Sequence, residues 1–279
     1  MIHIENLLFG YRKREPLFDG LNLEVTGGSV TGLLGKNGAG KTTLLKMMAG
    51  LIRPGKGSLS VMGFEPQNRP ASMLSDLFFV PEEFYTPSMS IKLYVNAYSV
   101  FYPKFDHALL HKTLAEFELD QQKSLKNMSY GQKKKFLISF ALATRCNLLI
   151  LDEPTNGLDI PGKALFRKIV AGSLSEEQLV LISTHQVRDV ENLLDQLIIL
   201  DRGQVIFKET IHQVSEQYEF GLGHKLEGTE ALYYEQAPGG YKYIAPASEF
   251  NESPVDLEIL FNAITSGNLK TKDHVNTIL

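Results

Sequence analysis

Short apolar runs recur along the first two thirds of the chain, separated by segments of helical length. Four such runs predict buried strands at residues 29–35, 147–152, 178–184 and 195–201. Runs without polar alternation are typical of a parallel sheet that is covered on both faces. The pattern therefore predicts an α/β core.

Helical patterns connect these strands. Residues 41–51 predict a helix directly after the first strand, with Gly50 as its stop signal, and a turn precedes a short strand near 58–62. From about residue 85 to 145 the pattern is mostly helical, with Asp106 as one amino-terminal cap. We interpret this stretch as a helical insertion in the core.

The pattern changes after about residue 210. Two aromatic-rich strands are expected on either side of the turn Pro238–Gly239–Gly240, followed by a short amphipathic helix in PVDLEILFNAITSG. The last residues, NLKTKDHVNTIL, are polar and predict a loose end. We therefore expect a core domain at 1–210, with its helical subdomain at about 85–145, and a small C-terminal accessory segment at 211–279.

Composition narrows the class of protein. With 279 residues, 43% of them hydrophobic, the chain can bury a full core and a small second domain. Its 28 basic and 32 acidic residues argue against nucleic acid as the main partner. The single cysteine, Cys146, favours a reducing, cytoplasmic setting. We expect no signal peptide, because MIHIENLLFGYRKREP carries charge where an apolar core would be needed. We expect no membrane span, because no apolar run approaches about 18 residues.

The segment GKNGAGKT at 35–42 matches the phosphate-binding loop pattern. Its glycines let the backbone wrap so that N–H groups point at phosphate oxygens, and the following helix adds its positive end. Lys41 can reach the outer phosphates, and the Thr42 hydroxyl can bind Mg²⁺. A glycine-rich turn without chemistry is the alternative, against which the flanking strand and helix argue.

Two adjacent carboxylates, Asp152 and Glu153, end the apolar run at 147–152. Charges near a core need partners, and a metal ion beside a bound triphosphate supplies one. Asp152 would hold Mg²⁺, and Glu153 would polarise an attacking water. His185 follows another predicted strand and could contact the γ-phosphate there. A carboxylate pair that merely caps the next turn is the alternative.

The segment NMSYGQKKKFLISFALA predicts an amphipathic helix that opens at Ser129–Gln132. A hydroxyl, N–H groups and a helix amino end are the parts of an anion site. A second anion site is redundant in a chain with one phosphate loop, unless two chains pair head to tail. A capped surface helix is the simpler alternative.

The order GKNGAGKTT, MSYGQ, LLILDEP, NGLD and STH resembles that of ATP-binding-cassette (ABC) ATPases, the nucleotide-binding subunits of ABC transporters, over about residues 1–210. The resemblance implies an α/β P-loop core with a mixed or parallel sheet and helices on both faces. An antiparallel β subdomain, the helical insertion and a small C-terminal α+β appendage complete the expected fold. It also implies that two cassettes sandwich two ATP molecules and hydrolyse them with Mg²⁺ to ADP and phosphate.

The resemblance further implies a role for each matching residue. ATP contacts fall on Tyr11, Gly35, Lys36, Asn37, Gly38, Ala39, Gly40, Lys41, Thr42 and Thr43. The signature that acts on the partner's ATP falls on Ser129, Tyr130, Gly131 and Gln132. Metal ligands fall on Thr42, Glu82 and Asp152, catalytic roles on Glu153 and His185, and a dimer contact on Asp159. Tyr11 would stack on adenine, with Phe9 as the alternative ring.

Three positions depart from the family pattern. Glu82 stands where glutamine is usual, so we expect slower turnover or an altered metal dependence in a site that still works. Tyr130 replaces the commoner glycine, so its ring must point away from the nucleotide or stack nearby. Ile160 replaces a proline, which we expect to be harmless.

The resemblance implies an ATPase bound to the cytoplasmic face of the membrane through separate permease chains, with a second cassette, identical or different, as its partner. The stretch EFYTPSMSIKLYVNAYSVFYP is the expected docking surface, although core packing explains part of it. We favour an exporter, because the chain shows a fused tail and no evident substrate-binding module. The segments SVFYPKFD and GQKKK also resemble antibiotic- or peptide-related exporters.

Two other functions are weighed against transport. A non-transport ABC ATPase that acts on a nucleic-acid or protein complex is disfavoured by the single cassette, the lack of a heptad run and the slight acidic excess. An ATP-gated regulatory module with negligible hydrolysis would rest on Glu82 alone.

Overall fold

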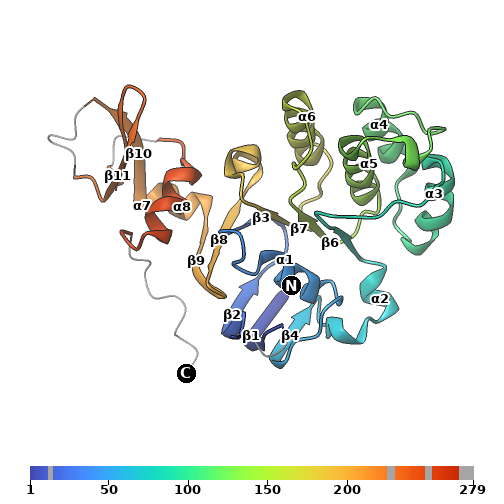
Figure 1. The fold of residues 1–279 in the computed structure, drawn as a ribbon, viewed down its shortest axis with the longest axis horizontal. Helices are drawn as coiled ribbons and strands as arrows, with labels where there is room; N and C mark the ends of the chain where they lie inside the picture. The colour runs from blue at the N-terminus through green and yellow to red at the C-terminus, as the bar shows by residue number, and fades with distance from the viewer. Residues whose placement is uncertain (12–14, 225–229, 249–252, 270–279) are drawn as a thin grey trace.

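The computed structural model describes residues 1–11, 15–224, 230–248 and 253–269 (Figure 1). Its centre is a six-stranded sheet in the order β5-β6-β7-β3-β8-β9. These strands are β5 (Leu77–Val80), β6 (Leu148–Asp152), β7 (Leu179–Thr184), β3 (Ser29–Leu34), β8 (Gln196–Asp201) and β9 (Gln204–Thr210). All neighbours are parallel except β8 and β9. The four predicted strands are confirmed, and two edge strands, the parallel β5 and the antiparallel β9, lie on either side of them.

A second, antiparallel sheet has the order β2-β1-β4. It consists of β1 (Ile2–Phe9), β2 (Phe18–Val25) and β4 (Lys56–Val61). The helix α1 (Lys41–Met48) packs with it in one apolar cluster (Figure 1). Gly50 follows α1 with a φ of 69°, and its N–H donates to the Met47 carbonyl at 2.9 Å, so the predicted stop is confirmed.

The central sheet separates two apolar cores. Along β6, Leu148 and Ile150 belong to the cluster that contains α1 and the antiparallel sheet. Leu149 and Leu151, which alternate with them, belong to the cluster on the opposite face. Strand side chains alternate between faces, so an uninterrupted apolar run can serve both cores.

The predicted helical stretch contains α3 (Ile91–Tyr98), α4 (His107–Glu116) and α5 (Tyr130–Ala143). Asp106 caps α4 as predicted, since its carboxylate accepts from the Leu109 N–H at 2.8 Å. The prediction that α5 is amphipathic is wrong, because every residue from Phe136 to Ala143 is buried. The helix runs inside the core between the sheet and α4, so it has no wet face over this length.

The remaining helices complete the elements of the structure. The α-helices are α2 (Ala71–Leu74), α6 (Ile160–Ala171), α7 (Ile211–Gln217) and α8 (Leu257–Thr265). The 3₁₀ turns are η1 (Pro66–Asn68), η2 (Ser99–Phe101), η3 (Leu125–Asn127), η4 (Val187–Asp189) and η5 (Glu191–Leu193).

The C-terminal region forms a three-stranded antiparallel sheet in the order β10-β12-β11, with α7 and α8 beside it. Its strands are β10 (Tyr218–Gly223), β11 (Tyr233–Ala237) and β12 (Gly240–Pro246). The two predicted strands and the predicted helix α8 are confirmed, and β10 is an addition. Most of the polar end that we expected to be loose, residues 270–279, lies outside the described residues.

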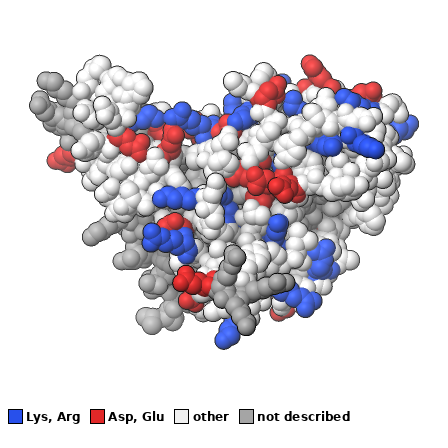
Figure 2. Space-filling view, in the orientation of Figure 1, with Lys and Arg blue, Asp and Glu red and all other residues white. Residues whose placement is uncertain are grey.

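Charge is mixed over the surface. Figure 2 shows Lys and Arg interspersed with Asp and Glu on the face in view. Within the described ranges, no helix has the length and apolar character needed to cross a bilayer.

Asp106 gives a test of the helical subdomain. Its carboxylate caps α4 and also accepts from Arg145 at 3.0 Å, and the capping N–H of Leu109 and Arg145 lower its pKa. Asp106→Ala should lower the free energy of unfolding by about 1 kcal/mol. Because the pKa is depressed on folding, this contribution is complete above the ordinary value of 3.8 and is lost as the pH falls further.

Urea unfolding at several pH values measures this difference. Asp106→Asn is the matched control, because it keeps a capping oxygen and removes only the charge. Equal stability of Asp106→Ala and the unchanged chain at neutral pH would contradict the assignment.

Candidate functional site

The predicted phosphate loop connects β3 to α1. Gly40 begins α1 with a φ of 108°, and a Cβ there would lie 2.7 Å from the Phe18 ring. A Cβ at Gly35 would lie 2.5 Å from the Leu200 carbonyl oxygen. The tip residues Lys36, Asn37 and Gly38 are exposed, and Ala39 is buried. The glycines therefore permit close packing at the ends of a loop whose tip faces solvent.

Lys41 is buried at the base of this loop. Its ammonium donates to the Gly35 carbonyl at 2.7 Å. Burial lowers the pKa of Lys41, and the carboxylates of Glu153, Asp152 and Glu82 act in the opposite direction. A cation held among three carboxylates beside a loop of backbone N–H groups suits the binding of an anion.

Tyr11 lies against the start of α1. Its hydroxyl is 3.1 Å from the Thr43 hydroxyl, and its ring contacts Phe9 edge-on with centroids 5.0 Å apart. The Tyr11 side chain is half exposed. The structure thus places both candidate adenine-stacking rings next to the loop.

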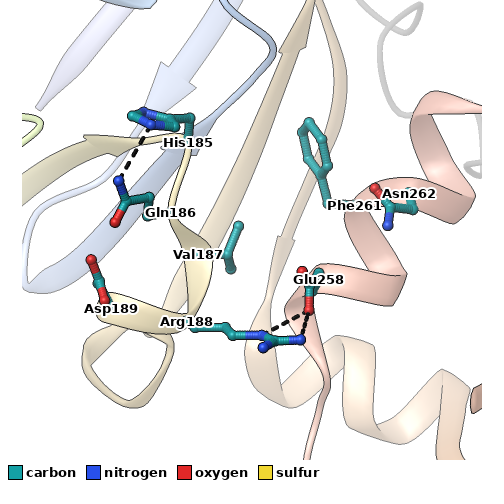
Figure 3. Close-up of a pocket in the computed structure, with 8 residues that line it drawn as sticks. All are labelled: His185, Gln186, Val187, Arg188, Asp189, Glu258, Phe261 and Asn262. Atoms are coloured by element: carbon teal, nitrogen blue, oxygen red, sulfur yellow. Dashed lines mark hydrogen bonds and ion pairs between the residues drawn. The ribbon is translucent and has the colours of Figure 1, made fainter. Parts of the chain in front are cut away.

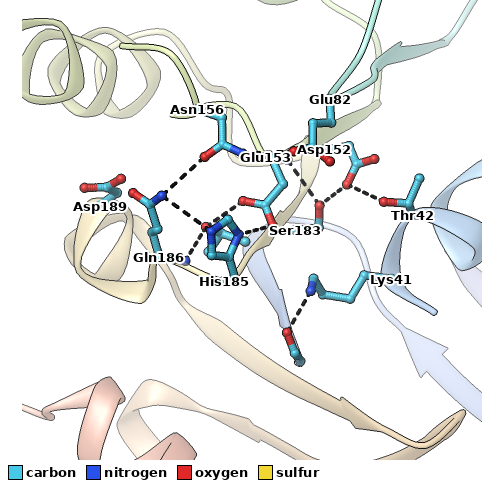
Figure 4. A network of polar contacts seen from close by, with 12 residues as sticks. Lys41, Thr42, Glu82, Asp152, Glu153, Asn156, Ser183, His185, Gln186 and Asp189 are labelled. Atoms are coloured by element: carbon cyan, nitrogen blue, oxygen red, sulfur yellow. Dashed lines mark hydrogen bonds and ion pairs between the residues drawn. The ribbon is translucent and has the colours of Figure 1, made fainter. Parts of the chain in front are cut away.

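Asp152, the last residue of β6, is fully buried. Its Oδ1 accepts from the Thr42 hydroxyl at 3.2 Å and from the Ser183 hydroxyl (Figure 4). Its Oδ2 has no hydrogen-bond partner within the part of the chain that the structure describes. An unpaired buried carboxylate oxygen next to a hydroxyl fits a hard cation such as Mg²⁺.

Glu153 adopts a left-handed backbone conformation, with a φ of 46°. Its N–H donates to the Ser183 carbonyl at 3.0 Å. One carboxylate oxygen lies 2.8 Å from His185 Nδ1, and the other accepts from the Thr184 hydroxyl at 3.2 Å. Positive φ values outside glycine concentrate at functional sites. The predicted carboxylate and histidine are in direct contact.

Three buried residues near the two carboxylates were not selected by the sequence analysis. Ser183 and Thr184 hold the two carboxylates, and both belong to the ST that precedes His185 in the predicted strand. Lys134 is fully buried inside α5, and desolvation lowers its pKa to about 8. Its place in the run GQKKK gave no sign of burial, because lysine runs are usually solvated.

Glu82 turns toward a chain of amide side chains. Its Oε1 accepts from the Asn156 amide at 3.0 Å, and the Asn156 carbonyl oxygen accepts from Gln186 at 3.4 Å. Gln186 in turn lies 3.5 Å from His185 Nε2 (Figure 4). Neither residue was assigned a role from the sequence, although Asn156 is the first residue of the NGLD motif and Gln186 directly follows STH.

The predicted signature residues lie at the start of α5. Ser129 and Gln132 form a capping box, since the Ser129 hydroxyl accepts from the Gln132 N–H and the Gln132 side chain accepts from the Ser129 N–H. Among described residues, no hydrogen bond joins them to the phosphate loop of the same chain. Gly131 packs so closely that a Cβ would lie 2.6 Å from the Gly157 carbonyl oxygen.

The ring of Tyr130 stacks on Phe84 with centroids 5.3 Å apart, and its hydroxyl donates to the Glu82 carbonyl at 2.5 Å. The ring is therefore held against the loop after β5, and how it lies relative to a bound nucleotide stays a prediction. Asp159 caps α6, accepts from the Gly162 N–H at 3.1 Å and keeps 68% of its side chain exposed. Ile160 beside it is also exposed.

The segment that begins at His185, after β7, also contacts the C-terminal unit. His185, Gln186 and η4 line a pocket whose other wall is α8, and Arg188 of η4 pairs with Glu258 of α8 (Figure 3). The C-terminal unit is therefore in contact with the segment that carries His185.

Comparisons with known proteins identify the family of the chain. The family model described as ABC transporter matches residues 18–156. The uncharacterized ABC transporter ATP-binding protein YdbJ of Bacillus subtilis is 32% identical over 223 residues, which cover 74% of this chain and 68% of YdbJ.

Two further relatives carry names with opposite directions of transport. The Nod factor export ATP-binding protein I of Burkholderia lata is 31% identical over 204 residues, covering 71% of this chain and 67% of that protein. The cobalt import ATP-binding protein CbiO of Salmonella paratyphi A is 31% identical over 219 residues, covering 74% and 79%.

A solved structure of the ATP-binding subunit of an ABC transporter superposes with a TM-score of 0.69 at 25% identity, covering 77% of this chain and 91% of that one. Fold, site and relatives agree: the chain belongs to the ABC transporter family and is one of its ATP-binding subunits, an ATPase.

Proposed function

We propose that the side chains at the carboxyl edge of the central sheet bind Mg²⁺-ATP and hydrolyse it by base catalysis, and that this turnover powers an exporter. The proposal rests on the contact between Glu153 and His185 at 2.8 Å, close to the buried Lys41 of the phosphate loop. Because Glu153 is almost fully buried and His185 contacts it, the carboxylate is held in one place where a water can meet it.

The roles in hydrolysis follow from these contacts. Glu153 accepts a proton from the attacking water, and His185 orients the carboxylate and contacts the γ-phosphate. Lys41 leaves the Gly35 carbonyl for the phosphates. The unpaired Oδ2 of Asp152 and the Thr42 hydroxyl would hold Mg²⁺, which neutralises charge on the phosphate oxygens when bound.

The second half of each ATP site comes from another cassette in this proposal. Ser129 and Tyr130 are exposed at the start of α5, as are Asp159 and Ile160 beyond β6, and the rest of the signature is partly exposed. We propose that the signature contacts the partner's ATP and that Asp159 contacts the partner cassette, a second copy of this chain or a related one. ATP binding closes the pair, and hydrolysis reopens it.

The membrane partner docks on the helical subdomain in this proposal. The exposed apolar side chains there are Tyr85, Leu93, Tyr98, Val100 and Phe101. Exposed aromatic and aliphatic groups on one segment are typical of a protein interface. We place the ATPase on the cytoplasmic face of the membrane, held by integral permease chains.

The finer assignments are export and the division of the chain. Relatives named for export and for import are equally similar, so the proposal of export rests on the sequence arguments: the fused tail, no evident substrate-binding module, and the resemblance of SVFYPKFD and GQKKK to exporters. Transport into inverted vesicles, with ATP outside, would support export. We further propose that residues 1–210 form the cassette and 211–279 an accessory unit, since the relatives named above cover 71–74% of the chain.

Glu153→Gln tests hydrolysis and closure together. Loss of the base should slow ATP turnover by on the order of 10²–10⁴ and trap the closed pair. Light scattering should therefore show a monomer without nucleotide and a dimer with Mg²⁺-ATP. Lys41→Ala is the control, which should stay monomeric because ATP is not held. Turnover at the unchanged rate in Glu153→Gln would refute the proposed base.

Glu82→Gln tests the departure from the family pattern. A carboxylate near the γ-phosphate adds negative charge, so its neutral isostere should raise turnover or shift the Mg²⁺ concentration for half-maximal rate by about threefold or more. Steady-state phosphate release across a Mg²⁺ titration measures both. Unchanged rate and unchanged Mg²⁺ dependence would show that the charge of Glu82 has no role.

The pair Val100→Ser and Phe101→Ser tests the docking surface. Removing both exposed apolar groups should reduce co-purification of the integral membrane partner by about tenfold, with ATP turnover of the isolated subunit unchanged. Leu51→Ser is the matched control, because Leu51 is 53% exposed at a distant position after α1. Equal recovery of the membrane partner with both variants would contradict this surface.

A further inference from the structure

Lys134 connects three elements of the site through one ammonium group. Its side chain is fully buried, and Nζ donates to the backbone carbonyls of Pro81 at 3.2 Å, Glu82 at 3.1 Å and Glu153 at 3.4 Å. The first two carbonyls follow β5 and the third follows β6. An ammonium has three donors, so all of them serve the backbone of the segments that carry Glu82 and Glu153.

Tyr130 stands one helical turn before Lys134 and holds the same backbone. Its hydroxyl and the Lys134 ammonium both donate to the Glu82 carbonyl oxygen. The ammonium lies 5.2 Å from the centre of the Phe84 ring and 5.6 Å from that of Tyr130. Residues four apart on a helix share a face, so one face of the α5 start contacts the loop after β5 through both side chains.

The segment after Glu153 is packed against the same helix start. The Glu153 carbonyl accepts from the Asn156 N–H at 3.3 Å as well as from Lys134. A Cβ at Gly157 would lie 2.4 Å from the Tyr130 ring. Neither segment can shift far without moving the amino end of α5.

An apolar side chain at position 134 would avoid the cost of burying an ammonium. Burial lowers the pKa of Lys134, which is the signature of that cost, and the carboxylates of Asp152, Glu82 and Glu153 offset part of it. Retaining a cation at this place makes sense if its three hydrogen bonds are needed.

We propose that Lys134 is a positioning residue: together with Tyr130 it fixes the backbone of Glu82 and Glu153 to the first turn of α5. The inference rests on the proposed roles of Glu153 as base and of the α5 start as the contact to the partner's ATP. A small displacement of α5 on contact with that ATP then moves the carboxylates of the chain's own site. The two ATP sites of a closed pair are thereby linked through backbone.

Lys134→Met tests the link, with Lys133→Met as the matched control on the same helix. Lys133 is not fully buried, and no hydrogen bond of its ammonium is found among the described residues. Lys134→Met should lower kcat by about tenfold or more, since misplaced groups lose rate steeply, with the Kd for ATP without Mg²⁺ changed less than about twofold. Amide exchange at Asn156, measured without nucleotide, should quicken in Lys134→Met only.

The exchange measurement needs no ATP, so it separates this inference from the proposed function. Unchanged exchange and unchanged kcat in Lys134→Met would overturn the positioning role while leaving the ATPase intact. If the protein without substitutions did not hydrolyse ATP, the proposed function would be refuted instead. The exchange result would still decide whether Lys134 holds the backbone.

Tyr130→Phe adds an independent readout. It removes one donor to the Glu82 carbonyl at an exposed position and should lower kcat by about threefold. Because both donors serve one oxygen, its effect should be non-additive with that of Lys134→Met and additive with that of Lys133→Met. If Lys134→Met does not fold, the kcat of Tyr130→Phe decides: an unchanged value would overturn the inference.

Discussion

Three carboxylates share one low-dielectric region in this protein, and the fold is arranged around keeping them there. Asp152 and Glu153 are buried at the end of β6, and Glu82 approaches from the neighbouring strand end. Charges in such a place require partners. The structure provides two buried lysines, Lys41 from the phosphate loop and Lys134 from the core of α5. Two hydroxyls of β7 donate hydrogen bonds to Asp152 and Glu153.

In the proposed function, this balance changes when nucleotide binds. Lys41 is the cation that can turn to phosphate, because its present acceptors are carbonyls of its own loop, those of Gly35 at 2.7 Å and Lys36 at 3.5 Å. Lys134 is buried, and its ammonium donates to three backbone carbonyls. In this proposal Lys41 binds the phosphates and Lys134 holds the backbone, although the same three carboxylates act on the pKa of both lysines.

Much of this site was predictable from sequence because parallel strands bring their ends together. The apolar runs fixed the strands, so the residues following them, among them Glu153 and His185, had to meet at one edge. The contacts of Lys134 were not predictable, because its sequence neighbours are lysines and its burial depends on how α5 packs. The edge strands β9 and β10 were missed because each joins its sheet by pairing, without a strong apolar run of its own.

The C-terminal unit was recognisable as strands and a helix, but its position was not. Sequence gives no register between α8 and η4, whereas the structure joins them through Arg188 and Glu258 (Figure 3). The unit therefore borders the segment that carries His185.

The alternation of β6 between two cores has a consequence for how this chain tolerates change in length. Leu149 and Leu151 serve one core, and Leu148 and Ile150 serve the other. Inserting a single residue within the strand would send each following side chain to the opposite core and would turn Asp152 away from Thr42. Substitutions among aliphatic residues preserve this order, whereas insertions and deletions destroy it. A change in chain length is therefore tolerated better in the loops before and after β6 than within the strand.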